Sequence, residues 1–121
     1  MKLPRKVDKP WGYELWWALT DVYAGKILHI EAGHRLSLQF HESKDESAYL
    51  LSGRLRLIKG PAEDRLTTVE LCPGDTWRNV PGEVHTLEAI EDCDVLEVST
   101  PELDDVVRLS DSYGREGTSA P

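Results

Sequence analysis

Short stretches of the chain alternate between apolar and polar residues, and turn-forming Gly, Pro and Asp residues separate them. Residues 36–41 show the alternation most clearly, with apolar side chains at every second position, and residues 54–59 resemble them. A period of two predicts β-strands, because successive side chains of a strand point to opposite faces. Further strands are expected at 13–17, 23–31, 48–51, 66–71, 76–80, 84–90 and 95–99. Many short strands with turns about every 8–12 residues indicate an all-β sandwich or barrel.

The two ends of the chain extend beyond this series of strands. Near the C-terminal end, Leu103, Val106 and Val107 are spaced at i, i+3 and i+4, which predicts a short helix. Acidic residues in its first turn would favour that helix through its dipole. We therefore expect a single domain over residues 1–121. Its expected parts are an N-terminal strand segment (9–20), a barrel core (23–99), and a C-terminal helix and tail (102–121).

Composition and charge exclude several classes of protein. The 121 residues are 40% hydrophobic and 30% charged, which is typical of a globular domain. No run of about 18 apolar residues is present, so no transmembrane helix is expected. The N-terminal residues also lack the apolar run of a secretory signal, so we expect a cytoplasmic protein without a membrane partner. A net charge of −8 argues against nucleic acid as a partner, because binding phosphate backbones requires clustered Lys and Arg.

Four polar residues have the chemistry and the spacing of metal ligands. Gln39 and His41 lie two positions apart on a predicted strand, so their side chains share one face. Glu46 follows after a short loop, from which its carboxylate could return to the same place, and His85 begins a later strand. Two imidazoles, a carboxylate and an amide oxygen suit Zn, Fe, Mn, Ni or Co. Each residue alone is more often structural or solvent-exposed, so the joint spacing carries the prediction of one divalent metal ion.

The spacing of these residues is similar to the two motifs of the cupin family. The first motif is a Gly, five residues, His-x-His, three or four residues, a Glu, six residues and a Gly; the second places a His after a Gly and a Pro-Gly turn. The matching residues are Gly33, Gln39, His41, Glu46 and Gly53 for the first motif, and Gly74, Pro81, Gly82 and His85 for the second. Gln39 replaces the first His, and Ala89 stands where the second motif usually ends in Asn. The resemblance covers residues 23–99 and implies a single cupin (jelly-roll) barrel.

The replacement of that His by Gln resembles the type II mannose-6-phosphate isomerases among the cupins. Residues 9–14, 35–39 and 104–115 are similar to the KPWG, RLSLQ and DDIVR…YGR segments of this group. The resemblance implies that the metal, expected to be zinc, is bound by Gln39, His41, Glu46 and His85. Basic residues recur in the matching segments, and five of them are candidates for binding a phosphate group: Lys9, Lys26, Arg35, Arg108 and Arg115.

This resemblance implies a metal-dependent isomerase that interconverts mannose 6-phosphate and fructose 6-phosphate, or an enzyme of closely related sugar-phosphate chemistry. The reaction needs a base to move a proton between two carbon atoms. Glu88 and His34 are candidates for it, and the sequence does not decide between them. Cupins commonly pair, so a homodimer is also expected. The aromatic residues of the N-terminal segment could lie in its interface or pack on their own barrel; they are Trp11, Tyr13, Trp16 and Trp17.

Two other functions stay open at this point. Two His and one carboxylate are also the ligands of non-haem iron oxygenases, which His41, Glu46 and His85 could supply. A non-catalytic, metal-containing ligand-binding cupin is the second alternative, because a fold does not fix its function. The chain also departs from the isomerase group beside the expected ligands, since residues 42–44 and 47–48 lack the group's His- and Arg-rich and His-Trp stretches.

Overall fold

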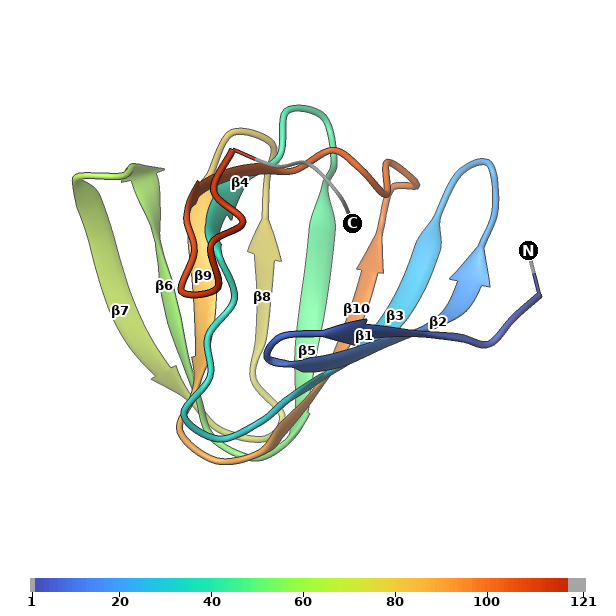
Figure 1. Ribbon diagram of the computed structural model, residues 1–121, viewed down its shortest axis with the longest axis horizontal. Coiled ribbons are helices and arrows are strands. Elements are labelled where there is room, and N and C mark those ends of the chain that lie inside the picture. The colour runs from blue at the N-terminus through green and yellow to red at the C-terminus, as the bar shows by residue number, and fades with distance from the viewer. Residues whose placement is uncertain (1, 118–121) are drawn as a thin grey trace.

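The computed structural model describes residues 2–117, which form eleven β-strands and no helix. The strands are β1 (Arg5–Lys9), β2 (Gly12–Leu19), β3 (Ala24–Ile30), β4 (Leu38–Phe40), β5 (Glu46–Ser52), β6 (Leu55–Ala62), β7 (Arg65–Leu71), β8 (Thr76–Asn79), β9 (Val84–Ala89), β10 (Cys93–Ser99) and β11 (Val107–Ser110). They make two antiparallel sheets that face each other, as Figure 1 shows. Within the described residues there is accordingly no helix that could span a membrane.

Each sheet joins strands that are distant in the sequence. The six-stranded sheet has the order β1-β2-β3-β10-β5-β8, and the five-stranded sheet has the order β11-β4-β9-β6-β7. In the second sheet Arg108 of β11 lies opposite Gln39 of β4, which lies opposite His85 of β9. Directly opposed residues of antiparallel strands point to the same face. Pairing therefore places polar side chains from three separate segments in one row on the inner face of this sheet.

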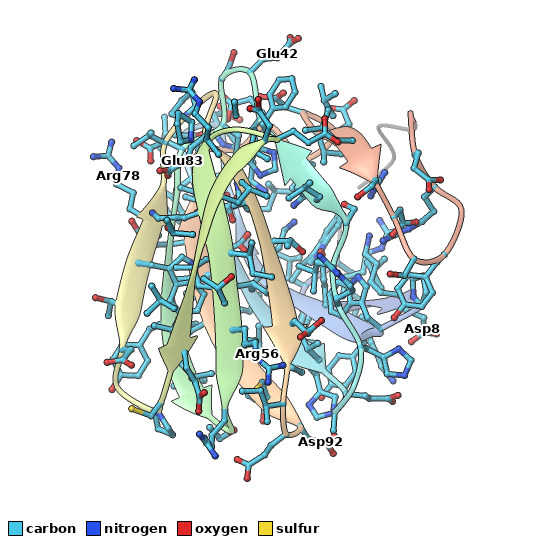
Figure 2. The ribbon with its side chains drawn as sticks, turned by 90° about the vertical axis from the view of Figure 1, so that its left-hand side faces the viewer. Asp8, Glu42, Arg56, Arg78, Glu83 and Asp92 are labelled. Atoms are coloured by element: carbon cyan, nitrogen blue, oxygen red, sulfur yellow. The ribbon has the colours of Figure 1, made fainter. Side chains whose placement is uncertain are left out.

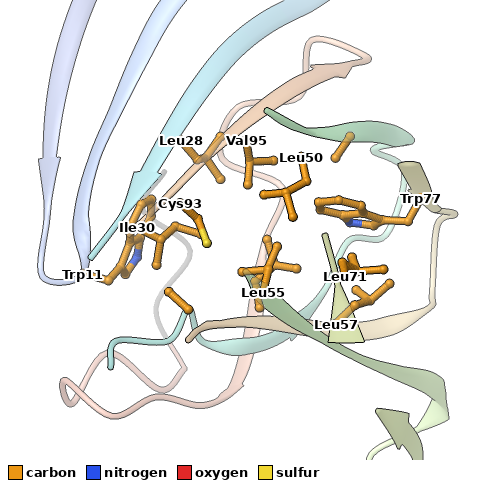
Figure 3. Close-up of a cluster of buried hydrophobic side chains, with 13 residues drawn as sticks. Trp11, Leu28, Ile30, Leu50, Leu55, Leu57, Leu71, Trp77, Cys93 and Val95 are labelled. Atoms are coloured by element: carbon orange, nitrogen blue, oxygen red, sulfur yellow. The ribbon is translucent and has the colours of Figure 1, made fainter. Parts of the chain in front are cut away.

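The core lies between the two sheets and is built from every second residue of the strands. In β5, Ala48 and Leu50 are buried, while Tyr49 and Leu51 point away from the core and are more than two-fifths exposed. Figure 3 shows the buried cluster, to which both sheets contribute and in which Trp77 packs at one side. This packing supplies the main stabilisation of the barrel, since burial of apolar surface dominates the free energy of folding.

The prediction of an all-β barrel is confirmed, but the predicted C-terminal helix is wrong. Within residues 102–117 the chain instead forms β11, which pairs with β4 through Val107 opposite Phe40 and Arg108 opposite Gln39. The predicted helix would be short, and isolated helices of fewer than about 12–15 residues are only marginally stable in water. The open edge of β4 offers these residues backbone hydrogen bonds and burial of Val106 instead. The rest of the predicted tail, 118–121, lies outside the described residues.

At two places the strands depart from the prediction in a way that affects the fold. β1 was not expected, because its sequence has one apolar residue among five; it forms by pairing with β2 across a tight turn, with Lys9 opposite Gly12. β6 extends beyond the predicted strand at 54–59 and continues to Ala62 through an irregular register, so that the turn before β7 is confined to two residues. The pairing of β1 with β2 brings Lys9 close to the predicted metal ligands, since Lys9 lines one pocket together with Gln39 and His41.

Candidate metal centre and anion pocket

Three of the predicted ligands converge at one end of the barrel. His41 directly follows β4, Glu46 begins β5, and His85 lies near the start of β9; each is at most 6% exposed. Glu46 Oε1 lies 2.6 Å from His41 Nε2 and 3.5 Å from His85 Nε2. The ligating atoms of all three lie within 4.8 Å of one another, so the group could hold a metal ion.

Backbone carbonyls fix how the two imidazoles face this point. His41 Nδ1 lies 2.6 Å from the carbonyl oxygen of Asp105, and His85 Nδ1 lies 2.9 Å from that of Glu83. A carbonyl oxygen can only accept, so each Nδ1 carries a hydrogen, and Nε2 is the ring atom that is turned towards Glu46. Metal-ligating histidines are commonly oriented in this way.

The buried atoms at the centre of the group lack the partners that such atoms normally have. His41 Nε2 and Glu46 Oε1 are both buried, and neither has a hydrogen-bond partner in the part of the chain that the structure describes. A proton or a metal ion between these two atoms, which lie 2.6 Å apart, would satisfy both of them. Burial alone would raise the pKa of Glu46, but the contacts with His41 and His85 and the charge of Lys44 hold that pKa well below its usual range. The residues therefore fit a divalent cation.

Gln39 borders this centre from the neighbouring strand. It lies opposite His85 in the β4–β9 pair, so the two side chains point to the same face. Its Oε1 accepts a hydrogen bond of 2.8 Å from the hydroxyl of Ser37. The hydrogen bond and the strand pairing thus hold the Gln39 amide on the same face as His85.

Glu97 on β10 is a functional-site residue that the sequence analysis missed. It is buried against Glu46, with which it shares a hydrogen bond, and its carboxylate lies 3.7 Å from Lys44 Nζ. Burial and the adjacent charge of Glu46 raise the pKa of Glu97 to about 8, so it holds a proton at neutral pH. The sequence contained one indication of this: Glu97 lies two positions after Val95 on the same strand, so its side chain points towards the core as that of Val95 does.

A second group of polar side chains forms a pocket beside the centre, which we call the anion pocket. Gln39 and His41 belong to its wall, so the pocket and the metal centre share residues. Four of the five predicted phosphate-binding residues line it: Lys9 from β1, Lys26 from β3, Arg108 from β11 and Arg115 from the segment after β11. The structure therefore brings together basic residues that are up to 106 positions apart in the sequence.

Positive charge is crowded in the anion pocket. Burial lowers the pKa of Lys9 and so do the charges of Lys26, Arg108 and Arg115; burial and Arg115 likewise lower the pKa of Arg108. Glu14, which also lines the pocket, has a lowered pKa because the charges of Lys26 and Lys9 outweigh the effect of its burial. A group of cations that destabilise one another's charged forms is an environment that favours a bound anion.

The remaining predicted residues lie elsewhere. Glu88 points away from His85, because the two differ by an odd number of positions on β9, and it pairs with Arg56 at 2.8 Å. Figure 2 shows Arg56 well below Glu42 and Glu83, which mark the end of the barrel that carries the metal centre. His34 Nδ1 contacts the Tyr113 hydroxyl at 2.6 Å and does not line the anion pocket. Arg35 lines a separate surface hollow with Ser110, Asp111, Ser112 and Glu116.

Comparison with solved structures shows what this barrel is similar to. The chain superposes on KdgF from Halomonas sp. with a TM-score of 0.73 at 21% identity, covering 84% of this chain and 89% of that one. It superposes on oxalate decarboxylase from Bacillus subtilis with a TM-score of 0.77 at 19% identity, covering 88% of this chain and 30% of that one. The fold is the cupin barrel.

Comparison of sequences adds a more similar relative of this cupin. The chain is 32% identical over 116 residues to the xanthan biosynthesis protein XanB of Xanthomonas campestris pv. campestris (strain B100). The match covers 92% of the chain and 24% of XanB, so the chain spans about a quarter of the length of that relative. None of the family models compared with the chain matches it.

Proposed function

We propose that this cupin is a metal-dependent sugar-phosphate isomerase that interconverts mannose 6-phosphate and fructose 6-phosphate, or an enzyme of closely related sugar-phosphate chemistry. One observation carries the proposal: a pocket lined by five basic residues shares His41 with a group that could hold a metal, and Gln39 also lines this pocket. A sugar phosphate has an anionic group at one end and oxygen ligands for a metal at the other. The similarity to a protein named for xanthan biosynthesis, xanthan being a polysaccharide, also favours a carbohydrate substrate.

The proposed metal ligands are His41, Glu46 and His85, with the amide oxygen of Gln39 as the fourth. Nitrogen and oxygen donors of this kind suit zinc, our first choice, and also Fe, Mn, Ni or Co. A bound divalent ion would polarise the carbonyl and neighbouring hydroxyl of a sugar and stabilise negative charge on their oxygens. Glu97 supports the ligand set by donating a hydrogen bond from its protonated carboxyl group to Glu46, which keeps that carboxylate oriented and ionised.

The basic residues of the anion pocket have the proposed task of binding the phosphate. Arg108 and Arg115 bring planar guanidinium groups to the pocket, and that of Arg115 is held by Asp111 through Nε and Nη2. Lys9 and Lys26 act as point charges. Because Arg108 lies in the same row as Gln39 and His85, a molecule held by its phosphate there would extend along the row towards the metal centre.

The decisive experiment is a coupled assay for fructose 6-phosphate formed from mannose 6-phosphate, run with metal-free protein and with protein reloaded with each candidate metal. We expect turnover that requires the metal. His41→Ala should lose both bound metal and activity, and His29→Ala, on the outer face and paired with Asp94 at 2.8 Å, should keep both. Metal retained by His41→Ala would contradict the ligand set. Metal-loaded protein without turnover of hexose phosphates would contradict the isomerase.

We also propose a homodimer. Its expected interface is the outer face of the six-stranded sheet, where Trp17, Tyr49 and Val98 are 44%, 42% and 47% exposed. Trp17 packs its ring over Gly25 on this face. Trp16 has a different place, since its indole N–H binds Glu14 and its ring lies under Lys26 beside the anion pocket. Of these two adjacent tryptophans, only Trp17 is therefore available to a partner.

A further inference from the structure

Glu14 lines the anion pocket, and the proposed function assigns it no role. It lies on β2 with its side chain only 12% exposed, and it lines the pocket together with Lys26 and His41. Its Oε1 accepts a hydrogen bond of 2.8 Å from Trp16 Nε1 and lies 3.2 Å from Lys26 Nζ. Both contacts are made by Oε1, and they orient the carboxylate within the lining of the pocket.

The other proton acceptors that line the anion pocket, among the residues described, are engaged. His41 uses Nδ1 on the Asp105 carbonyl and turns Nε2 to the metal centre. The Asp105 carboxylate accepts three backbone N–H groups, from Glu42 at 2.9 Å, Ser43 at 2.7 Å and Lys44 at 2.9 Å. Glu14 is the remaining carboxylate of the lining.

We propose that Glu14 is the catalytic base that carries the proton between C2 and C1 of the sugar phosphate, an inference that rests on the proposed isomerase function. The Glu14 carboxylate removes the proton from C2. The electron pair of that C–H bond becomes the second C1–C2 bond, and the carbonyl pair moves onto O1. Glu14 then returns the proton to C1 while O2 becomes the carbonyl oxygen and its hydroxyl proton passes to O1. Atoms and electrons balance without a further reactant.

The surroundings of Glu14 suit this task. The charges of Lys26 and Lys9 outweigh burial and lower the pKa of Glu14, so the carboxylate is ionised at neutral pH, which is the state in which a base begins the reaction. Lys26 is itself held by the Trp16 ring, whose centroid lies 5.0 Å from Nζ. Glu14, Lys26 and Trp16 therefore form a rigid group on β2 and β3, which is what a base needs to reach one particular carbon atom.

The test compares Glu14→Gln and Glu14→Asp with the wild type in four measurements: isomerisation, deuterium uptake at C1 and C2 in D2O, metal content, and binding of inorganic phosphate by calorimetry. Glu14→Gln should lower kcat by about 10²- to 10⁴-fold and abolish deuterium uptake, while metal content and phosphate affinity stay close to wild type. Glu14→Asp should restore part of kcat. Glu88→Gln, the matched change on the outer face, should leave all four measurements unchanged.

The outcomes separate the two proposals. Wild type that binds metal and phosphate without isomerising hexose phosphates overturns the proposed function and this inference with it. Active wild type together with fully active Glu14→Gln overturns the inference alone. Loss of phosphate binding in Glu14→Gln, in step with the loss of activity, would assign Glu14 to the structure of the pocket and overturn its role as base. If Glu14→Gln fails to fold, Glu14→Asp with intact binding and unchanged kcat overturns the inference.

Discussion

Buried carboxyl groups set the charge of the metal centre. Glu46 and Glu97 lie side by side away from water, where two negative charges would repel strongly. The pKa of Glu46 is held well below its usual range and that of Glu97 is raised to about 8, so the pair keeps one proton and carries one negative charge. Because imidazoles bind metals in their neutral form, this single carboxylate charge would leave a bound divalent cation partly uncompensated and able to attract the oxygens of a substrate.

Glu97 should make the stability of the metal-free protein depend on pH. Between 4.5 and about 8 the folded protein keeps a proton on Glu97 that the unfolded chain releases. The free energy of unfolding should therefore fall as pH rises through this range. Urea denaturation of metal-free protein at about pH 5 and about pH 9 should show a smaller fall for Glu97→Gln, whose side chain is neutral in both states. The same fall in both proteins would contradict the assignment of the proton to Glu97.

Short-range spacing made part of the site predictable at the scale of residues. Gln39 and His41 share a strand face whatever the fold, and Glu46 follows after too short a loop to move far away. Glu97 and Glu14 were not predictable in the same way. Their positions depend on which strands become neighbours and on the register between them, such as Lys26 opposite Glu97 and Trp16 opposite Lys26. That information is tertiary and has no local signature.

At the scale of elements, the segment before β11 links the metal centre to the anion pocket. Asp105 supplies its carbonyl to His41 and its carboxylate to three N–H groups of the loop between β4 and β5. Three residues later, Arg108 enters the pocket from β11. The spacing of apolar residues in this segment predicted a helix, which is wrong. Such spacing indicates which residues are buried, but it does not indicate which strand the segment pairs with. An exposed edge of β4 made a strand the better solution.

We expect the Asp105 side chain to be needed for metal binding although it is no ligand. Asp105→Ala leaves three loop N–H groups without their acceptor and releases the carbonyl that orients His41. Groups that orient ligands typically contribute about 10- to 100-fold in metal affinity. Competition with a chelator should therefore show zinc bound at least about 10-fold more weakly. Asp104→Ala changes an exposed neighbour and serves as the matched control; equal zinc affinity in the two variants would refute the role of Asp105.

At the scale of the whole molecule, the acidic composition and the cationic pocket are compatible because folding redistributes charge. The chain carries 22 acidic and 14 basic residues, and its average charge predicts no anion site. Four basic residues from the two ends of the sequence nevertheless meet in one pocket. Local potential depends on which charges become neighbours and how deeply they are buried, so a net negative charge argues against nucleic acid more strongly than it argues against a small phosphate ester.

We expect two copies of the chain to associate through the outer face of the six-stranded sheet. Inner residues of its strands form the core, so the alternating outer residues should be polar if the face met only water. Tyr49 and Val98 lie there instead, next to Leu96 in the middle of the sheet. A second copy of the chain that packs the same face would bury these residues in both subunits at once, because a two-fold interface uses one surface twice.

Tyr49→Glu should therefore convert a dimer to a monomer. The substitution places one carboxylate from each subunit in an apolar interface, where burial without a partner is costly, but in a monomer it only adds a charge at an exposed position. Light scattering after gel filtration should show wild type at twice the chain mass and Tyr49→Glu at the chain mass. Val69→Glu, at a 52% exposed position on β7 of the other sheet, should remain a dimer. A monomeric wild type, or a dimeric Tyr49→Glu, would contradict this interface.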